Sequence, residues 1–79
     1  MKNSIEKLIN EYAMKIQMCD KVIHGLEETK RIARREKFIE DSKRIRGELQ
    51  VVYAQRQSYV QAKVDIDSLL DNLEETHAN

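Results

Sequence analysis

Apolar residues in the first half of this chain recur at alternating steps of four and three residues, which is the spacing of a helix with one apolar seam. The residues of this first seam are Ile5, Ile9, Tyr12, Ile16, Cys19, Ile23 and Leu26. With Ile5 at heptad position d, the a and d positions stay apolar through three heptads, which is typical of a coiled coil. A helix is therefore the first expectation for this half of the chain.

A second, looser seam runs through the C-terminal half. Its d positions are Ile45, Val52, Tyr59, Ile66 and Leu73, and its a positions are Leu49, Arg56, Lys63 and Leu70. Two of these a positions are charged, so we expect Arg56 and Lys63 to lay their stems along the seam with their heads outside, or to pair with an acidic residue. Charged a positions also help to specify the register and the number of partners.

Both seams weaken between Leu26 and Ile45, where the chain is very polar. We predict an all-α fold in which residues 1–79 form one unit, a two-helix antiparallel coiled-coil hairpin. The expected helices cover about 4–37 and 42–76, with the turn within 37–42. The alternative is one long coiled-coil helix of roughly 115 Å at a rise of 1.5 Å per residue, because no proline interrupts the chain.

Two pairing registers of the helices are compatible with the hairpin. The first centres the turn on Lys37 and Phe38, and it pairs residues of the two seams as Ile5 with Leu70, Ile9 with Ile66, Ile16 with Tyr59, Ile23 with Val52, and Leu26 with Leu49. The second lies one heptad later and centres the turn on Asp41, where Asp41 or Ser42 would act as the N-cap of the second helix. Gly25 and Gly47 are expected to be helical and to weaken their helices, unless another backbone approaches Gly47 closely.

A single hairpin of this size buries little apolar surface, and apolar residues beside the seams widen each stripe toward the face of a helical bundle. The simplest partner is a second copy, because symmetric homodimers are the commonest oligomers. We therefore expect a homodimer that forms a four-helix bundle. The candidate docking or dimer surface comprises Met14, Met18, Val22, Tyr53 and Val60.

The chain has fourteen basic and fourteen acidic residues, so any electrostatic preference must be local. The candidate phosphate or partner contacts are Lys30, Arg31, Arg34, Arg35, Lys37, Lys43, Arg44 and Arg46. The acidic C-terminal residues are Asp65, Asp67, Asp71, Glu74 and Glu75. A hairpin would gather the basic residues at its turn, although favourable i,i+4 pairs, Glu27 with Arg31 and Glu40 with Arg44, fit an ordinary solvated helix.

The remaining polar residues form no recognisable catalytic, cofactor or metal pattern. Cys19 occupies a d position, where a small buried thiol is ordinary. His24 and His77 have no convincing partner at metal-ligand spacing. Asp65, Asp67 and Asp71 lack the glycine and the closing glutamate of a calcium loop. We therefore expect no enzymatic activity and no cofactor.

The absence of an apolar span and the single cysteine favour a cytoplasmic protein without membrane contact. The expected function is that of a self-associating helical protein acting as a structural, adaptor or regulatory protein–protein interaction module. The alternative is a nucleic-acid-associated regulator that binds phosphate through the basic segment Lys30–Arg46.

Overall fold

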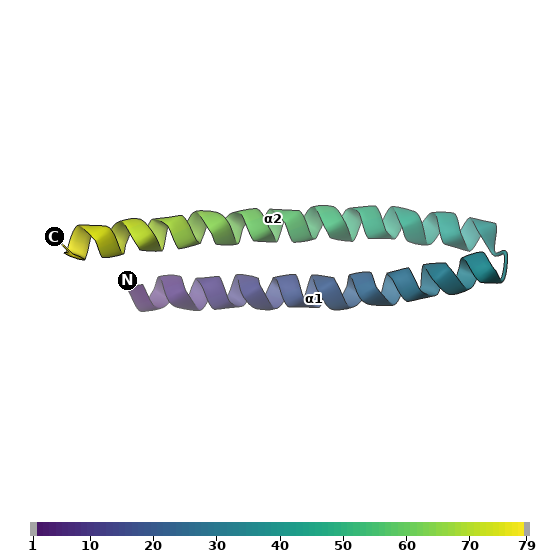
Figure 1. The fold of residues 1–79 in the computed structure, drawn as a ribbon, viewed down its shortest axis with the longest axis horizontal. Helices are drawn as coiled ribbons and strands as arrows, with labels where there is room; N and C mark the ends of the chain where they lie inside the picture. Colours follow the sequence, from purple (N-terminus) through teal and green to yellow (C-terminus); the bar gives the residue numbers. More distant parts are fainter. Residues whose placement is uncertain (1, 79) are drawn as a thin grey trace.

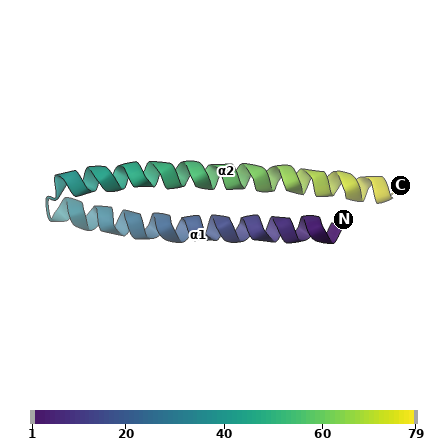
Figure 2. The same cartoon turned by 180° about the vertical axis from the view of Figure 1, so that it is seen from behind.

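The computed structural model describes residues 2–78, with side chains up to residue 75. Two helices, α1 (Lys2–Arg35) and α2 (Ile39–Ala78), are joined by residues 36–38. The helices run antiparallel and lie side by side along all of α1, with both ends of the chain at the same end of the molecule (Figure 1, Figure 2). The predicted all-α hairpin is confirmed, and the single unbroken helix is not adopted.

The molecule is a thin rod of 63 × 14 × 13 Å. Its length is that of α2, since 40 residues at a rise of 1.5 Å per residue give about 60 Å. Its width is that of a helix pair, so every side chain lies close to solvent. No described side chain is completely buried.

The tightest packing lies in the half of the rod nearer the turn. Ile23, Ala33, Ile45 and Leu49 form one buried cluster, and the partly buried Leu26 and Val52 pack against it. This cluster contains both members of the pairs Ile23–Val52 and Leu26–Leu49, in agreement with the register centred on Lys37 and Phe38. Toward the open end, the seam residues are only partly buried.

The first helix ends in a Schellman motif formed around a lysine. Lys37 has a φ of 62°, in the left-handed region that favours glycine. Its amide donates to the Arg34 carbonyl at 3.1 Å, and the Phe38 amide donates to the Ala33 carbonyl at 2.8 Å. Two carbonyls at the helix end are thereby satisfied, and the chain reverses without a glycine.

The second helix begins earlier than Asp41 or Ser42, the residues expected to cap it. The Ser42 amide already donates to the Phe38 carbonyl at 3.0 Å, so Ser42 lies inside the first turn. Glu40 and Asp41 are also in this turn, where their negative carboxylates interact favourably with the positive end of the helix dipole. The connection occupies 36–38 rather than 37–42, because the Schellman motif ends α1 without a conventional turn sequence.

Both glycines lie within helices, as expected. A Cβ placed on Gly25 or Gly47 would meet nothing within 4 Å, so neither glycine permits a close approach of another backbone. The close-packing alternative for Gly47 is therefore wrong.

Candidate interaction surfaces

The hairpin has two broad faces, one on each side of the seam. Residues two apart on a helix do not share a face, and Asp20 and Val22 accordingly flank the seam on opposite sides of α1. We call the side of Asp20 the bridged face, after the bonds Arg56–Asp20 and Tyr53–Glu27 that cross it. We call the side of Val22 the groove face, because a hollow lined by Val22 opens there.

On the bridged face, polar side chains are bonded from helix to helix. Arg56 Nε donates to Asp20 Oδ1 at 2.6 Å, and this hydrogen bond, with the charge of Asp20, raises the pKa of the guanidinium. The Tyr53 hydroxyl donates to the Glu27 carboxylate. This hydrogen bond is the main reason why the pKa of Tyr53 is raised above 10.0, and burial and the charge of Glu27 act in the same direction.

The two charged seam residues behave differently. Arg56 reaches across the seam to the other helix, whereas Lys63 pairs within its own helix, with 3.1 Å between Lys63 Nζ and Asp67 Oδ2. Of these two seam residues, only Arg56 therefore links the helices. Near the open end, Lys2 adds a second ion pair between them, with Glu74 at 3.1 Å.

A hollow of about 360 Å³ opens on the groove face. It is lined by Lys15, Met18, Cys19, Val22, Val52, Gln55 and Tyr59. The Lys15 ammonium lies 5.0 Å from the ring centroid of Tyr12 and 5.5 Å from that of Tyr59. Such cation–π contacts let the lysine cover the aromatic rings while its charge stays hydrated. The rest of the lining is largely apolar.

The exposed apolar side chains are concentrated on this same face. Leu8 and Ile32 lie two heptads from Val22 and Met18, so they continue the lining of the hollow along α1. On α2, Val51 lies four residues before Gln55 and Leu69 lies fourteen residues after it, so both continue the lining of the hollow along this helix. Of the eleven large apolar side chains that are exposed in the described region, six thus lie on the groove face. These six are Leu8, Met18, Val22, Ile32, Val51 and Leu69.

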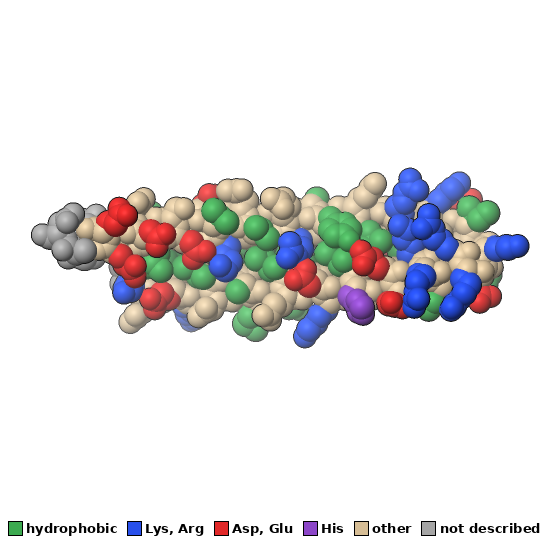
Figure 3. Space-filling view, viewed as in Figure 1, with side chains coloured by type: hydrophobic (Ala, Val, Ile, Leu, Met, Phe, Trp, Pro, Cys, Tyr) green, Lys and Arg blue, Asp and Glu red, His purple; other side chains and the backbone are tan. Residues whose placement is uncertain are grey.

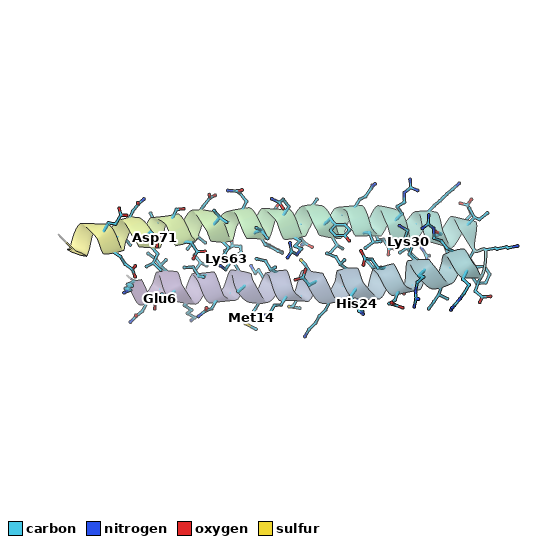
Figure 4. The ribbon with its side chains drawn as sticks, in the orientation of Figure 1. Glu6, Met14, His24, Lys30, Lys63 and Asp71 are labelled. Carbon is cyan, nitrogen blue, oxygen red and sulfur yellow. The ribbon has the colours of Figure 1, made fainter. Side chains whose placement is uncertain are left out.

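The five candidate docking residues do not share one surface. Met18 and Val22 line the groove. Met14 points away from α2 (Figure 4). Tyr53 lies on the bridged face, and Val60, one heptad later, is on the same side. The sequence analysis missed Lys15 and Gln55 as groove residues. Lys15 lies one heptad before Val22, and Gln55 directly precedes the a position Arg56 as Val22 precedes the a position Ile23. These heptad positions are the signal that places both residues beside the groove.

The eight candidate basic residues gather at the turn end of the rod, and acidic residues gather at the open end (Figure 3). Residues 30–46 have eight basic and three acidic side chains, whereas residues 2–11 and 65–75 together have two basic and seven acidic ones. The two ends therefore have formal charges of +5 and −5. The molecule is electrically polarised along its length.

Most of these basic side chains have no acidic partner within the part of the chain that the structure describes. Arg31 pairs with Glu28 at 2.7 Å, and Arg44 pairs with Asp41 at 3.7 Å. The expected partners were Glu27 and Glu40, but Glu27 instead accepts the hydrogen bond of Tyr53. Six basic side chains form no ion pair with any described residue, namely Lys30, Arg34, Arg35, Lys37, Lys43 and Arg46.

The groups most often used in catalysis are dispersed. Cys19 is buried and His24 is exposed, while the side chain of His77 lies outside the described residues. Asp65 accepts a hydrogen bond from Gln61 one turn earlier, as Asp67 does from Lys63. Among the described residues, no three His, Cys, Asp or Glu side chains come close enough to hold a metal ion.

Neither helix, over its described residues, has a stretch long and apolar enough to cross a bilayer. Comparison with protein-family models found no match for this chain, and neither did comparison with curated proteins or with solved structures.

Proposed function

We propose that this chain is a non-enzymatic, self-associating helical protein that works as a structural, adaptor or regulatory protein–protein interaction module. The observation that carries this proposal is the unequal division of apolar surface between the two faces. The bridged face has its central polar groups bonded within the hairpin. The groove face has six exposed apolar side chains and an apolar hollow.

A second copy of the chain is the occupant that best fits the groove face. Met18 is at the middle of α1, and the hollow therefore lies close to the middle of the rod. A two-fold axis through this point would place groove against groove, so that each Met18 faces the partner's hollow. The product would be a coiled-coil four-helix bundle, which gives the thin seam a second layer of apolar contacts.

The charges favour an antiparallel arrangement of the two hairpins. In this arrangement, the basic turn end of one copy lies beside the acidic open end of the other. A parallel arrangement would bring two ends of formal charge +5 together, which like-charge repulsion disfavours over distances of about a Debye length, roughly 10 Å at 0.1 M salt.

A pair of methionine variants tests this surface. Met14 and Met18 are 64% and 65% exposed and one turn apart, but only Met18 lines the groove. A symmetric dimer of Met18→Asp loses two buried methionines at about 1.5–3 kcal/mol each. At 1.4 kcal/mol per factor of ten, its dissociation constant should rise by about 10²- to 10⁴-fold. Met14→Asp should dimerise like the parent chain.

Sedimentation equilibrium over a range of protein concentrations measures both constants. A parent chain that is folded and monomeric at micromolar concentration would overturn the proposal of self-association. A dimer that tolerates Met18→Asp and is lost in Met14→Asp would retain self-association but exclude the groove face as its surface.

A second candidate function is that of a nucleic-acid-associated regulator. It is favoured by the six unpaired basic side chains at the turn end of the rod. If phosphate contacts carry this binding, the affinity for DNA or RNA must fall steeply with salt. No binding to either, even at low salt, would exclude it.

A further inference from the structure

The turn end of the rod has a hollow of about 430 Å³ between the last turn of α1 and the first two turns of α2. It is lined by Ala33, Arg34, Lys37, Ile39, Ser42, Lys43 and Arg46. Four of these seven residues are cationic, and none is acidic. We call this hollow the basic hollow.

Two smaller hollows adjoin the basic hollow and share its cations. One, of about 350 Å³, continues along α2 and is lined by Lys43, Arg46, Gly47 and Gln50. The other, of about 230 Å³, continues along α1 and is lined by Glu27, Lys30, Arg31 and Arg34. Since Arg34 borders one neighbour and Lys43 and Arg46 border the other, the three hollows form one basic surface across both helices.

The ion pairs of the turn end are arranged around the basic hollow rather than within it. Arg31 and Arg44, the two paired arginines of this region, do not line it. Arg34, Lys37, Lys43 and Arg46 do line it, and they have no ion pair with any described side chain. Four unpaired cations around one hollow repel one another, and a bound anion would relieve this repulsion.

We propose that the basic hollow binds adjacent phosphate groups. Two arginines supply planar donor forks that match phosphate oxygens, and two lysines add point charges. Ser42 also lines the hollow and adds a hydroxyl donor. A volume of about 430 Å³ has room for more than one phosphate.

The same lining argues against recognition of bases. No aromatic side chain lines the basic hollow, so it lacks the aromatic surface on which bases usually stack. A free oligophosphate and the backbone of a nucleic acid share the phosphate chemistry that the hollow fits. The inference deepens the second candidate function and is independent of self-association through the groove face.

Two double variants of equal charge test the basic hollow in the full chain. Arg34→Gln/Arg46→Gln removes two arginines that line it, whereas Arg31→Gln/Arg44→Gln removes two paired arginines from the same end of the rod. All four residues are exposed, so both variants should keep the helical circular dichroism of the parent chain. The probes are inorganic tripolyphosphate, followed by calorimetry, and a labelled oligothymidylate, followed by fluorescence anisotropy.

For the oligothymidylate, losing two phosphate contacts should weaken binding by about 50- to 100-fold at 50 mM salt. It should also lower the slope of log affinity against log salt concentration by about 1.4, because each phosphate contact with a single strand contributes about 0.7. The control variant should lose much less affinity, because Arg31 and Arg44 do not line the basic hollow and are already paired with Glu28 and Asp41.

Binding of tripolyphosphate that Arg34→Gln/Arg46→Gln abolishes and the control keeps would support the basic hollow as a site for free oligophosphate. The same pattern with the oligothymidylate alone would support binding of the nucleic-acid backbone. Equal losses in the two variants would overturn the basic hollow while leaving a diffuse basic end able to bind nucleic acid. If neither probe binds the parent chain, the basic hollow and the second candidate function both fail, and self-association is unaffected.

Discussion

The left-handed conformation of Lys37 predicts that replacing this residue by glycine stabilises the hairpin. Its φ of 62° places the Cβ close to the following carbonyl, which costs roughly 1–2 kcal/mol for any residue other than glycine. Glycine removes this cost but loses about 0.4–1 kcal/mol to the greater freedom of its unfolded state. The net gain should be about 0.5–1 kcal/mol in the free energy of unfolding.

Lys37→Ala is the matched control. It removes the same charge and the same exposed side chain but keeps the Cβ, so it should be no more stable than the parent chain. For a domain of this size, the gain in Lys37→Gly corresponds to a rise of about 2–8 °C in Tm. Urea and thermal unfolding, followed by circular dichroism, measure these differences, and all variants are compared at one protein concentration because self-association makes Tm depend on concentration.

The comparison between Lys37→Gly and Lys37→Ala decides the outcome. If the glycine variant is no more stable than the alanine variant, the Schellman motif does not hold Lys37 in the left-handed region in solution. The end of α1 at Arg35 would then have another cause.

Two further predictions concern Gly25 and Tyr53. Gly25→Ala should raise the free energy of unfolding by about 1 kcal/mol, because alanine is the better helix former and its Cβ meets nothing within 4 Å; a loss of stability in urea unfolding would mean that another surface approaches Gly25. The raised pKa of Tyr53 means that its hydrogen bond to Glu27 contributes fully below pH 10.0 and is lost as pH rises through the raised pKa. The stability difference between the parent chain and Tyr53→Phe, measured by urea unfolding at each pH, should therefore be constant below pH 10.0 and shrink above it, and a constant difference throughout would contradict the proposed contact.

The heptad pattern favoured two antiparallel helices but also permitted one long helix, and the structure adopts the hairpin. Apolar residues at a and d positions must leave water together, and the polar segment between Leu26 and Ile45 offers no third apolar stripe, so a hairpin satisfies both seams. The pairing of Ile23 with Val52 and of Leu26 with Leu49 follows from the register and agrees with the buried cluster. The position of the turn was predicted less well, because Lys37 adopts the left-handed conformation, which lysine does not favour.

Some properties of the two surfaces follow from the sequence, and others follow only from the tertiary structure. The sequence alone determined which residues are basic, which are apolar and how often they recur, and these properties dictate helices, a seam and a polarised rod. Only the tertiary structure decided which face each side chain shares with the other helix. Tyr53 and Val22 are similar candidates in the sequence, but an antiparallel pairing places them on opposite faces, where Tyr53 bonds to Glu27 and Val22 lines the groove. Contacts between residues far apart in the chain depend on the relative rotation and register of the helices, and the heptad pattern by itself allowed two registers without choosing between them.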